Sequence, residues 1–154
     1  MLTCMWMIVC REVSEEYGRE VIRLCELLMG VMSASLGLEE RRFREAFGGA
    51  ECGACLRANY YPRCPQPDLT LGLSAHSDPG VLTVLLADDH VRGLQVRRAG
   101  VDGEWVTVQP ARHDAFIVNV GDQIQVHILL RRRLRRRPRD VVRACMRAHM
   151  HGWW

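Results

Sequence analysis

Lysine is absent from this sequence: all 21 basic residues are arginine, which we attribute to a GC-rich coding sequence rather than to chemistry. A membrane-spanning run is absent too, because the apolar opening Met1–Cys10 is too short to cross a bilayer and no basic residue precedes it. No secretory signal is visible either. We therefore expect a hydrophobic N-terminal lead or a gene-model oddity rather than a membrane anchor, and a cytoplasmic protein without a membrane partner.

A complete zinc-binding motif of cysteines and histidines is also missing. The seven Cys form an odd number, which favours reduced thiols in a cytosolic protein over a disulfide framework. The spacing Cys52-Gly-Ala-Cys55 matches half of a zinc motif, but no second pair or histidine partner lies nearby. We therefore expect a structural or incidental role for this pair.

The overall composition is typical of a soluble globular domain. With 154 residues, 48% hydrophobic and 25% charged, the chain can form one domain with a modest core, and we expect a monomer. Its net charge of +3 conceals a split: the segment from His127 holds nine Arg and one Asp, whereas the first 126 residues carry net −5. A nucleic-acid or nuclear-address role is one interpretation of this basic segment. Clustered Arg without interleaved aromatics is generic, however, so we expect no nucleic-acid partner.

The first third of the chain has helical periodicity. Apolar residues at helical spacing predict a long amphipathic helix from Glu12 to Leu36. Acidic residues occupy its first turns, where the helix dipole favours them, and Gly37 is a natural stop. A shorter helix is expected from Glu39 to Phe47.

After Cys55 the chain changes to short β-prone stretches bounded by turn residues. The first, Leu56–Tyr61, ends in a proline-rich loop. Further strand candidates follow at regular spacing: Leu71–Ser77, Val81–Ala87, Leu94–Arg98, Trp105–Gln109 and Ala115–Val120. This spacing favours an all-β sandwich or barrel, here behind a helical front, so the predicted fold class is α+β.

A candidate metal site lies at the end of the second of these stretches, at His76-Ser77-Asp78. Residues i and i+2 of a strand point to the same face, so the imidazole of His76 and the carboxylate of Asp78 can coordinate the same ion. They would supply two corners of a 2-His-1-carboxylate facial triad, which leaves open positions on Fe(II). The alternative is a surface His beside a turn Asp, because Asp78-Pro79-Gly80 is itself a turn signature.

The surroundings of this pair contain several distinctive stretches. Asn59-Tyr-Tyr-Pro62 and Leu73-Ser-Ala-His-Ser-Asp78 are followed by Leu82–Leu85, Gly93–Val96, Trp105–Val108 and Ile117–Gln125. In combination they resemble plant Fe(II)/2-oxoglutarate-dependent dioxygenases of secondary metabolism, over roughly residues 11–125. The lead-in Gly53–Arg57 and Leu73–Asp78 look closest to the leucoanthocyanidin-dioxygenase-like and jasmonate-oxidising branch.

This resemblance implies a double-stranded β-helix, or jelly roll, backed by helices. It also implies an oxidoreductase that uses Fe(II), 2-oxoglutarate and O2 to hydroxylate or oxidise a small organic substrate. His76 and Asp78 match two iron ligands of the family. Asn59 and Tyr61 match positions that help to hold 2-oxoglutarate, although a Tyr before Pro also commonly packs structurally.

Arg57 shares a strand parity with residues 59 and 61. If those residues line the pocket, Arg57 points inward and needs an anionic partner, because an unpaired buried charge is very costly. One interpretation is a contact with a substrate carboxylate, which would suit jasmonate-like acids. The other is an internal salt bridge to an acidic residue.

The resemblance ends after Gln125. The family continues into a strand that bears the third ligand, a His, and then an Arg-x-Ser pair that anchors 2-oxoglutarate. Counting from Gly121 places these positions near Arg137 and near Arg147-Ala148-His149, where neither motif is present. The last barrel strands are expected to be missing, which would leave exposed sheet edges. A fortuitous triad with His127, His149 or His151 is improbable, because metal sites need close structural support.

Four segments are therefore predicted: an atypical lead at 1–10, a helical segment at 11–55, a partial jelly roll at 56–126 and an Arg-rich non-family tail at 127–154. A retained intron or frameshift beginning near Val126 would produce this pattern. The leading functional prediction is an Fe(II)/2-oxoglutarate oxygenase whose activity is impaired by the missing ligand. The alternative is a non-catalytic truncated product.

Overall fold

The computed structural model describes residues 2–49, 53–88, 93–97, 103–108, 114–134 and 146–149. The chain divides into two compact units, Met1–Ala58 and Asn59–Trp154. Each unit is described by itself. Within these ranges, the structure describes the side chains of residues 10–49, 53–88, 93–97, 103–108 and 114–128. The buried apolar side chains among them are Met29, Phe43 and Ile124.

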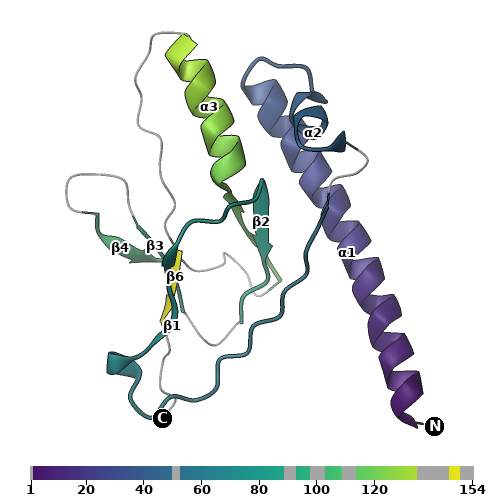
Figure 1. Cartoon of the computed structure of the whole chain (residues 1–154), viewed down its shortest axis with the longest axis vertical. Helices are drawn as coiled ribbons and strands as arrows, with labels where there is room; N and C mark the ends of the chain where they lie inside the picture. Colours follow the sequence, from purple (N-terminus) through teal and green to yellow (C-terminus); the bar gives the residue numbers. More distant parts are fainter. Residues whose placement is uncertain are drawn as a thin grey trace. The chain divides into compact units, whose positions relative to one another are not determined.

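The first unit is a helical hairpin of α1, Leu2–Ser35, and α2, Arg42–Ala46 (Figure 1). The helix α1 begins at Leu2 rather than at the expected Glu12, so residues 2–10 are continuous with it. No Gly or Pro lies between Leu2 and Tyr17 to interrupt the helix. The predicted end is confirmed: Gly37 has φ 69°, and its amide and that of Leu38 donate to carbonyls of the last turn.

Ser33 connects the two helices of this unit. Its side chain is fully buried, and its Oγ accepts a hydrogen bond of 3.2 Å from the backbone N–H of Phe43. The N-cap residue of α2, Arg41, makes no side-chain capping bond, so Ser33 satisfies a donor at the start of α2 from another helix. Met29 and Phe43 are buried in the same unit.

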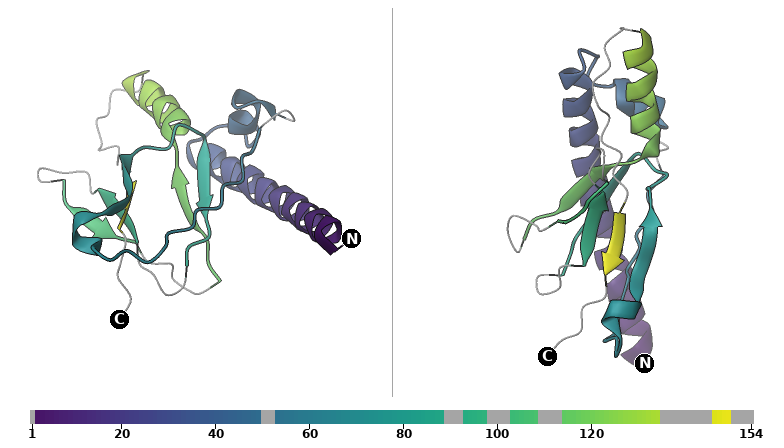
Figure 2. Two further views of the ribbon diagram at one scale, coloured as in Figure 1. Left: turned by 60° about the horizontal axis from the view of Figure 1, so that its bottom comes forward. Right: turned by 90° about the vertical axis from the view of Figure 1, so that its left-hand side faces the viewer.

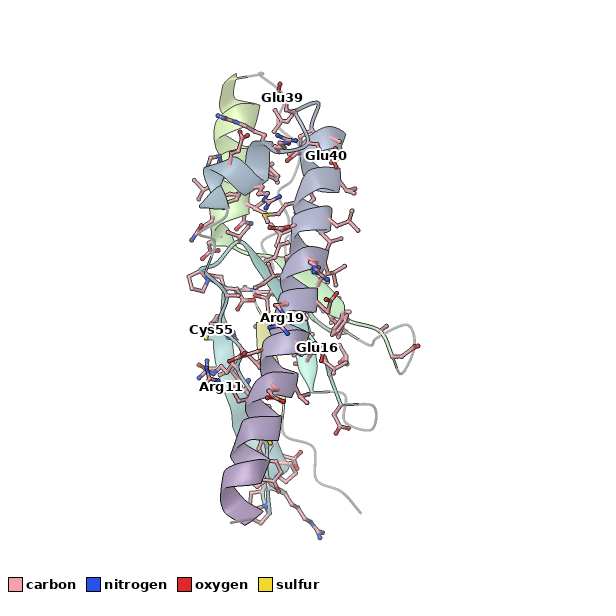
Figure 3. The ribbon with its side chains drawn as sticks, turned by 90° about the vertical axis from the view of Figure 1, so that its right-hand side faces the viewer. Arg11, Glu16, Arg19, Glu39, Glu40 and Cys55 are labelled. Atoms are coloured by element: carbon pink, nitrogen blue, oxygen red, sulfur yellow. The ribbon has the colours of Figure 1, made fainter. Side chains whose placement is uncertain are left out.

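The exposed surface of α1 carries apolar side chains, Val13, Leu27 and Val31, as well as charged ones. Ion pairs join Arg11 to Glu15 at 2.7 Å and Arg23 to Glu20 at 2.6 Å. Figure 3 shows Arg11, Glu16 and Arg19 along α1, with Glu39 and Glu40 beyond its C-terminal end. Among the described parts of the chain, no helix has the length and apolar character required to span a bilayer.

The second unit contains the five strands that the sequence predicts from residue 71 onwards. They are β1 Leu71–His76, β2 Leu82–Leu85, β3 Leu94–Arg97, β4 Trp105–Thr107 and β5 Ile117–Val120. A short 3-10 helix, η2 Pro67–Leu69, precedes β1 within the proline-rich loop. Within the described residues, β1, β2, β4 and β5 are one to three residues shorter than expected, and Arg98 and Gln109 lie outside the described part of the chain.

The strands form two antiparallel sheets. One has the order β1-β6-β3-β4, and the other pairs β2 with β5. The strand β6, Met146–His149, lies between β1 and β3 and is antiparallel to both (Figures 1 and 2). The tail therefore contributes a central strand, which its sequence pattern does not indicate. Alternation along a sequence is a weak signal for a strand this short, whereas backbone pairing on both edges specifies it.

The tail also begins inside a helix. The helix α3, Asp122–Leu134, follows β5 directly and runs through the predicted boundary at residues 126 and 127. Asp122 lies in its first turn, where a carboxylate is favoured, and neither Gly nor Pro occurs from Asp122 to Leu134. The first residues of the predicted Arg-rich tail, 127–134, are therefore helical. Residues 135–145 lie outside the described part of the chain.

Candidate metal centre

His76 and Asp78 lie where β1 ends and the following turn begins. His76 is the last residue of β1, and Asp78 follows two positions later. The Nε2 atom of His76 lies 3.5 Å from Oδ1 of Asp78, and the two side chains are 37% and 18% exposed. The two side chains that the sequence predicts as ligands therefore face one another at a partly open position.

The ring of His76 is oriented by its own strand. Its Nδ1 lies 2.8 Å from the carbonyl oxygen of Ser74. A carbonyl can only accept a hydrogen bond, so Nδ1 carries the proton and the neutral ring keeps its lone pair on Nε2. A backbone carbonyl commonly fixes metal-binding histidines in this way. The atom that faces Asp78 is thus the one able to bind a cation.

The carboxylate of Asp78 is held from the second sheet. Its Oδ2 accepts hydrogen bonds from Oγ1 of Thr83 at 2.5 Å and from Nδ2 of Asn119 at 2.8 Å. Thr83 belongs to β2 and Asn119 to β5. Sequence reasoning did not identify either residue as part of the site, although both lie in stretches that carry the family resemblance. The signal that identifies them is their pairing opposite one another in the β2–β5 ladder.

The turn after Asp78 is fixed by the start of α3. The carbonyl oxygens of Asp78, Gly80 and Val81 accept hydrogen bonds of 2.8, 3.2 and 2.9 Å from consecutive amides at residues 121–123. A Cβ at Gly121 would lie 2.2 Å from the carbonyl oxygen of Gly80, so only glycine permits this approach. The hydroxyl of Ser77 adds a 2.9 Å bond to the carboxylate of Asp122.

The His76–Asp78 pair fits two coordination positions of a divalent cation. Two ligand atoms about 2.1 Å from one ion, at right angles, lie about 3.0 Å apart, so a movement of about half an ångström would suffice. The fit extends to two donors: within the described ranges, no three His, Cys, Asp or Glu residues come together as a metal site.

The other histidines of the tail do not complete this pair where they are described. His149 pairs with Leu71, five positions from His76 along β1, whereas Met146 pairs with His76, so His149 lies about 10 Å or more from His76. His127 is exposed on α3. Arg137, where counting places the third ligand, and His151 both lie outside the described residues.

The expected strand Leu56–Tyr61 is not formed, which is a correction to the sequence prediction. Residues 53–64 contain no helix or strand, and the side chains of Arg57, Asn59 and Tyr61 are exposed. An extended segment becomes a strand only when a neighbour pairs with its backbone, and no described strand pairs with this one. The inference that Arg57 is buried by strand parity is therefore not met in this structure.

A comparison against known families agrees with this fold. The sequence model of the 2OG-Fe(II) oxygenase superfamily matches residues 52–151, which is well over half of the chain. The chain belongs to this superfamily. The match includes β6 and most of the Arg-rich tail, so it extends beyond Gln125.

Two of the similar proteins come from Arabidopsis thaliana. Jasmonate-induced oxygenase 3 is 61% identical over 118 residues, which cover 76% of this chain and 32% of that protein. Protein DOWNY MILDEW RESISTANCE 6 is 44% identical over 115 residues, which cover 75% and 32%. The chain thus spans about a third of the length of the curated relatives that it matches.

A solved structure shows the same fold. The crystal structure of JOX2 in complex with 2OG, Fe, and JA matches with a TM-score of 0.78 and 51% sequence identity, over 92% of this chain and 38% of that one. The predicted class, helices with a partial jelly roll, is therefore confirmed. Oxygenases of this superfamily use Fe(II), 2OG and O2, and the matched structure holds the first two.

Proposed function

We propose that His76 and Asp78 are two protein ligands of Fe(II) in an oxidoreductase that uses 2OG and O2 to oxidise a small organic molecule. One observation carries this proposal: Nε2 of a His76 ring held in the ligating tautomer faces Oδ1 of Asp78 at 3.5 Å. When bound, iron supplies the activation of O2, coupled to oxidation of 2OG. The protein's own part is to hold the ion with two side chains that are already oriented.

The substrate in this proposal is a plant metabolite that carries a carboxylate. The similar proteins named jasmonate-induced oxygenases, and the JOX2 structure that contains JA, support this class. Asn59 and Tyr61 are proposed to help hold 2OG, and Arg57 to meet the substrate carboxylate. Because all three are exposed here, their roles require this segment to become covered by 2OG, by substrate or by further chain. An internal salt bridge is the competing role for Arg57.

We further propose that residues 1–154 by themselves turn over poorly. Metal affinity depends on the number and geometry of ligands, and the described residues provide a two-donor site. In this case the chain binds a divalent cation weakly at His76 and Asp78. The alternative is a non-catalytic chain whose pair holds no metal.

The decisive experiment measures Co(II) binding and 2OG-dependent succinate formation by this chain. The same measurements are made on a version that continues after Gln125 with the sequence of jasmonate-induced oxygenase 3. We expect weak Co(II) binding that His76→Ala abolishes, and succinate formation at least a hundredfold faster in the extended version. Equal turnover by both chains would remove the proposed impairment. Co(II) binding that is unchanged in His76→Ala and Asp78→Ala would remove the proposed site.

Arg57→Ala, made in the extended version, separates the two roles of that residue. A substrate contact predicts a KM for a jasmonate-like acid raised tenfold or more, with an unchanged midpoint of unfolding. An internal salt bridge predicts the reverse, a lower midpoint with unchanged KM.

The cellular setting remains a proposal as well. We infer a monomer in the cytoplasm with small-molecule partners, and with neither a membrane nor a nucleic acid as partner. Among the described cysteines, Cys10, Cys55 and Cys64 are free thiols, which supports a reducing compartment. Sedimentation of the purified chain and imaging of a fluorescent fusion test these two points.

A further inference from the structure

Thr83 and Asn119 form a cross-strand pair beside the carboxylate of Asp78. The β2–β5 ladder pairs Leu82 with Val120, Thr83 with Asn119 and Val84 with Val118. Side chains directly opposite in an antiparallel ladder lie on the same face, about 5 Å apart at Cβ. The ladder therefore places the hydroxyl of Thr83 and the amide of Asn119 side by side, and both donate a hydrogen bond to Oδ2 of Asp78.

The two bonds divide the carboxylate into two unlike oxygens. A carboxylate oxygen has two lone pairs in its plane, and Oδ2 accepts two hydrogen bonds, one from Thr83 and one from Asn119. Oδ1 receives no hydrogen bond from the described residues and faces Nε2 of His76. Both donors are neutral, so they orient the group without cancelling its charge.

We propose that Thr83 and Asn119 are positioning residues that make Asp78 bind a metal ion through Oδ1 alone. A carboxylate without these bonds can turn and chelate through both oxygens, which would fill a second coordination position. The clamp, meaning these two bonds to Oδ2, keeps that position open for 2OG or O2. This inference rests on the proposed function, because it needs a cation between His76 and Asp78.

The backbone supports the clamp from the other side of Asp78. Asp122 N–H donates to the Asp78 carbonyl at 2.8 Å, and Gly121 directly follows β5, which carries Asn119. The main chain of Asp78 is thus tied to the start of α3 while its side chain is tied to β2 and β5. Because the main chain of Asp78 is fixed as well, its carboxylate stays within hydrogen-bonding distance of Thr83 and Asn119.

The test compares variants by Co(II) affinity and by the carboxylate infrared bands of the Co(II)-loaded chain with 13C-labelled Asp. Thr83→Val and Asn119→Ala are each expected to weaken Co(II) binding about tenfold. Both substitutions should also reduce the frequency difference between the antisymmetric and symmetric carboxylate stretching bands. A smaller difference marks a change from one-oxygen to two-oxygen ligation. Thr83→Ser keeps the hydroxyl and should restore both readouts. Thr107→Val, on the exposed face of β4, is the matched control and should change neither.

Two results would overturn the clamp: affinities of Thr83→Val and Asn119→Ala equal to that of Thr107→Val, or unchanged carboxylate bands. If the original chain shows no His76-dependent Co(II) binding, the proposed function fails. The two hydrogen bonds of the clamp are then tested on the metal-free chain. In that case Asn119→Ala should lower the unfolding midpoint less in an Asp78→Ala background than in the original chain. Equal shifts in both backgrounds would show that Asn119 does not hold Asp78.

Discussion

The helical unit and the β unit are held together by contacts of different range. In the helical unit, two ion pairs of α1 join residues three or four positions apart, Ser33 reaches Phe43 ten positions away, and Glu26 pairs with Arg44 eighteen positions away. In the β unit, Asp78 is bonded to Asn119 across 41 positions and Ser77 to Asp122 across 45. The candidate site thus depends on chain that is more distant in sequence than the partners within the helical hairpin are.

This difference indicates which substitutions should disturb the candidate site. Local contacts re-form whenever a helix forms, but long-range contacts require the whole β unit to close first, which costs loop entropy. Residues 119–123 therefore matter for the candidate ligands His76 and Asp78 as much as the residues next to them in sequence do. Substitutions in the two units should consequently have separable effects.

The largest effect is expected from proline in the central strand. Ala148 pairs with Leu73 on one side and Leu94 on the other. Ala148→Pro removes a backbone donor and should destabilise the β unit by about 3 kcal/mol. Hydrogen exchange should show lost protection in β1 and β3 and unchanged protection in α1. Val106→Pro on the edge strand β4 should cost less, and an equal loss in both variants would contradict the central position of β6.

A smaller effect is expected at the junction of the turn and α3. Gly121→Ala forces a Cβ against backbone atoms of Gly80, which cannot move aside as a flexible side chain could. We expect a loss of about 2 kcal/mol in the free energy of unfolding of the β unit, measured with denaturant. Gly80→Ala is the matched control, because a Cβ there meets nothing within 4 Å. Comparable losses in the two variants would refute the close approach.

The helical unit should respond locally. Ser33→Ala leaves the buried N–H of Phe43 without its acceptor and should cost about 1 kcal/mol. Thermal unfolding followed at helical wavelengths measures this loss, while Co(II) binding at His76 should remain unchanged. Ser35→Ala, whose hydroxyl bonds only within α1 and is exposed, should have little effect. A change of Co(II) affinity in Ser33→Ala would mean that the units are coupled.

The smallest effect concerns pH on α1. The hydrogen bond from Arg11, and then its charge, hold the pKa of Glu15 below its usual range. A lowered folded-state pKa adds stability that is present above the unfolded pKa and is lost as pH falls through the folded pKa. Carboxyl NMR titration should show the pKa of Glu15 rising in Arg11→Ala. Because the pair is fully exposed, the stability of α1 should change little, and a large change would contradict its local character.

The sequence predicts those elements whose signals are local. The five strands from Leu71 to Val120 each combine β-prone residues with a turn sequence at their ends, and the structure confirms all five. The end of α1 at Gly37 follows equally from one residue type. In contrast, Leu56–Tyr61 has strand composition but lacks a paired neighbour, and it is not a strand. β6 is the opposite case, because two neighbours make a strand of four unremarkable residues.

The candidate site divides in the same way. His76 and Asp78 are detectable from sequence, because a two-residue spacing places both side chains on one face of a strand. The roles of Thr83 and Asn119 are not detectable without the β2–β5 register, because a shift of one residue would turn both side chains away. Gly121 likewise seems an ordinary turn residue until the backbone of Gly80 is placed against it.

The sequence by itself determined which donors this chain offers a metal ion, an imidazole and a carboxylate two positions apart, and which superfamily that pattern belongs to. Only the tertiary structure decided which oxygen of Asp78 faces His76 and which is occupied by Thr83 and Asn119. The reason is physical: side-chain identity and alternation act over a few residues, whereas orientation of a carboxylate is set by donors that folding brings from distant strands.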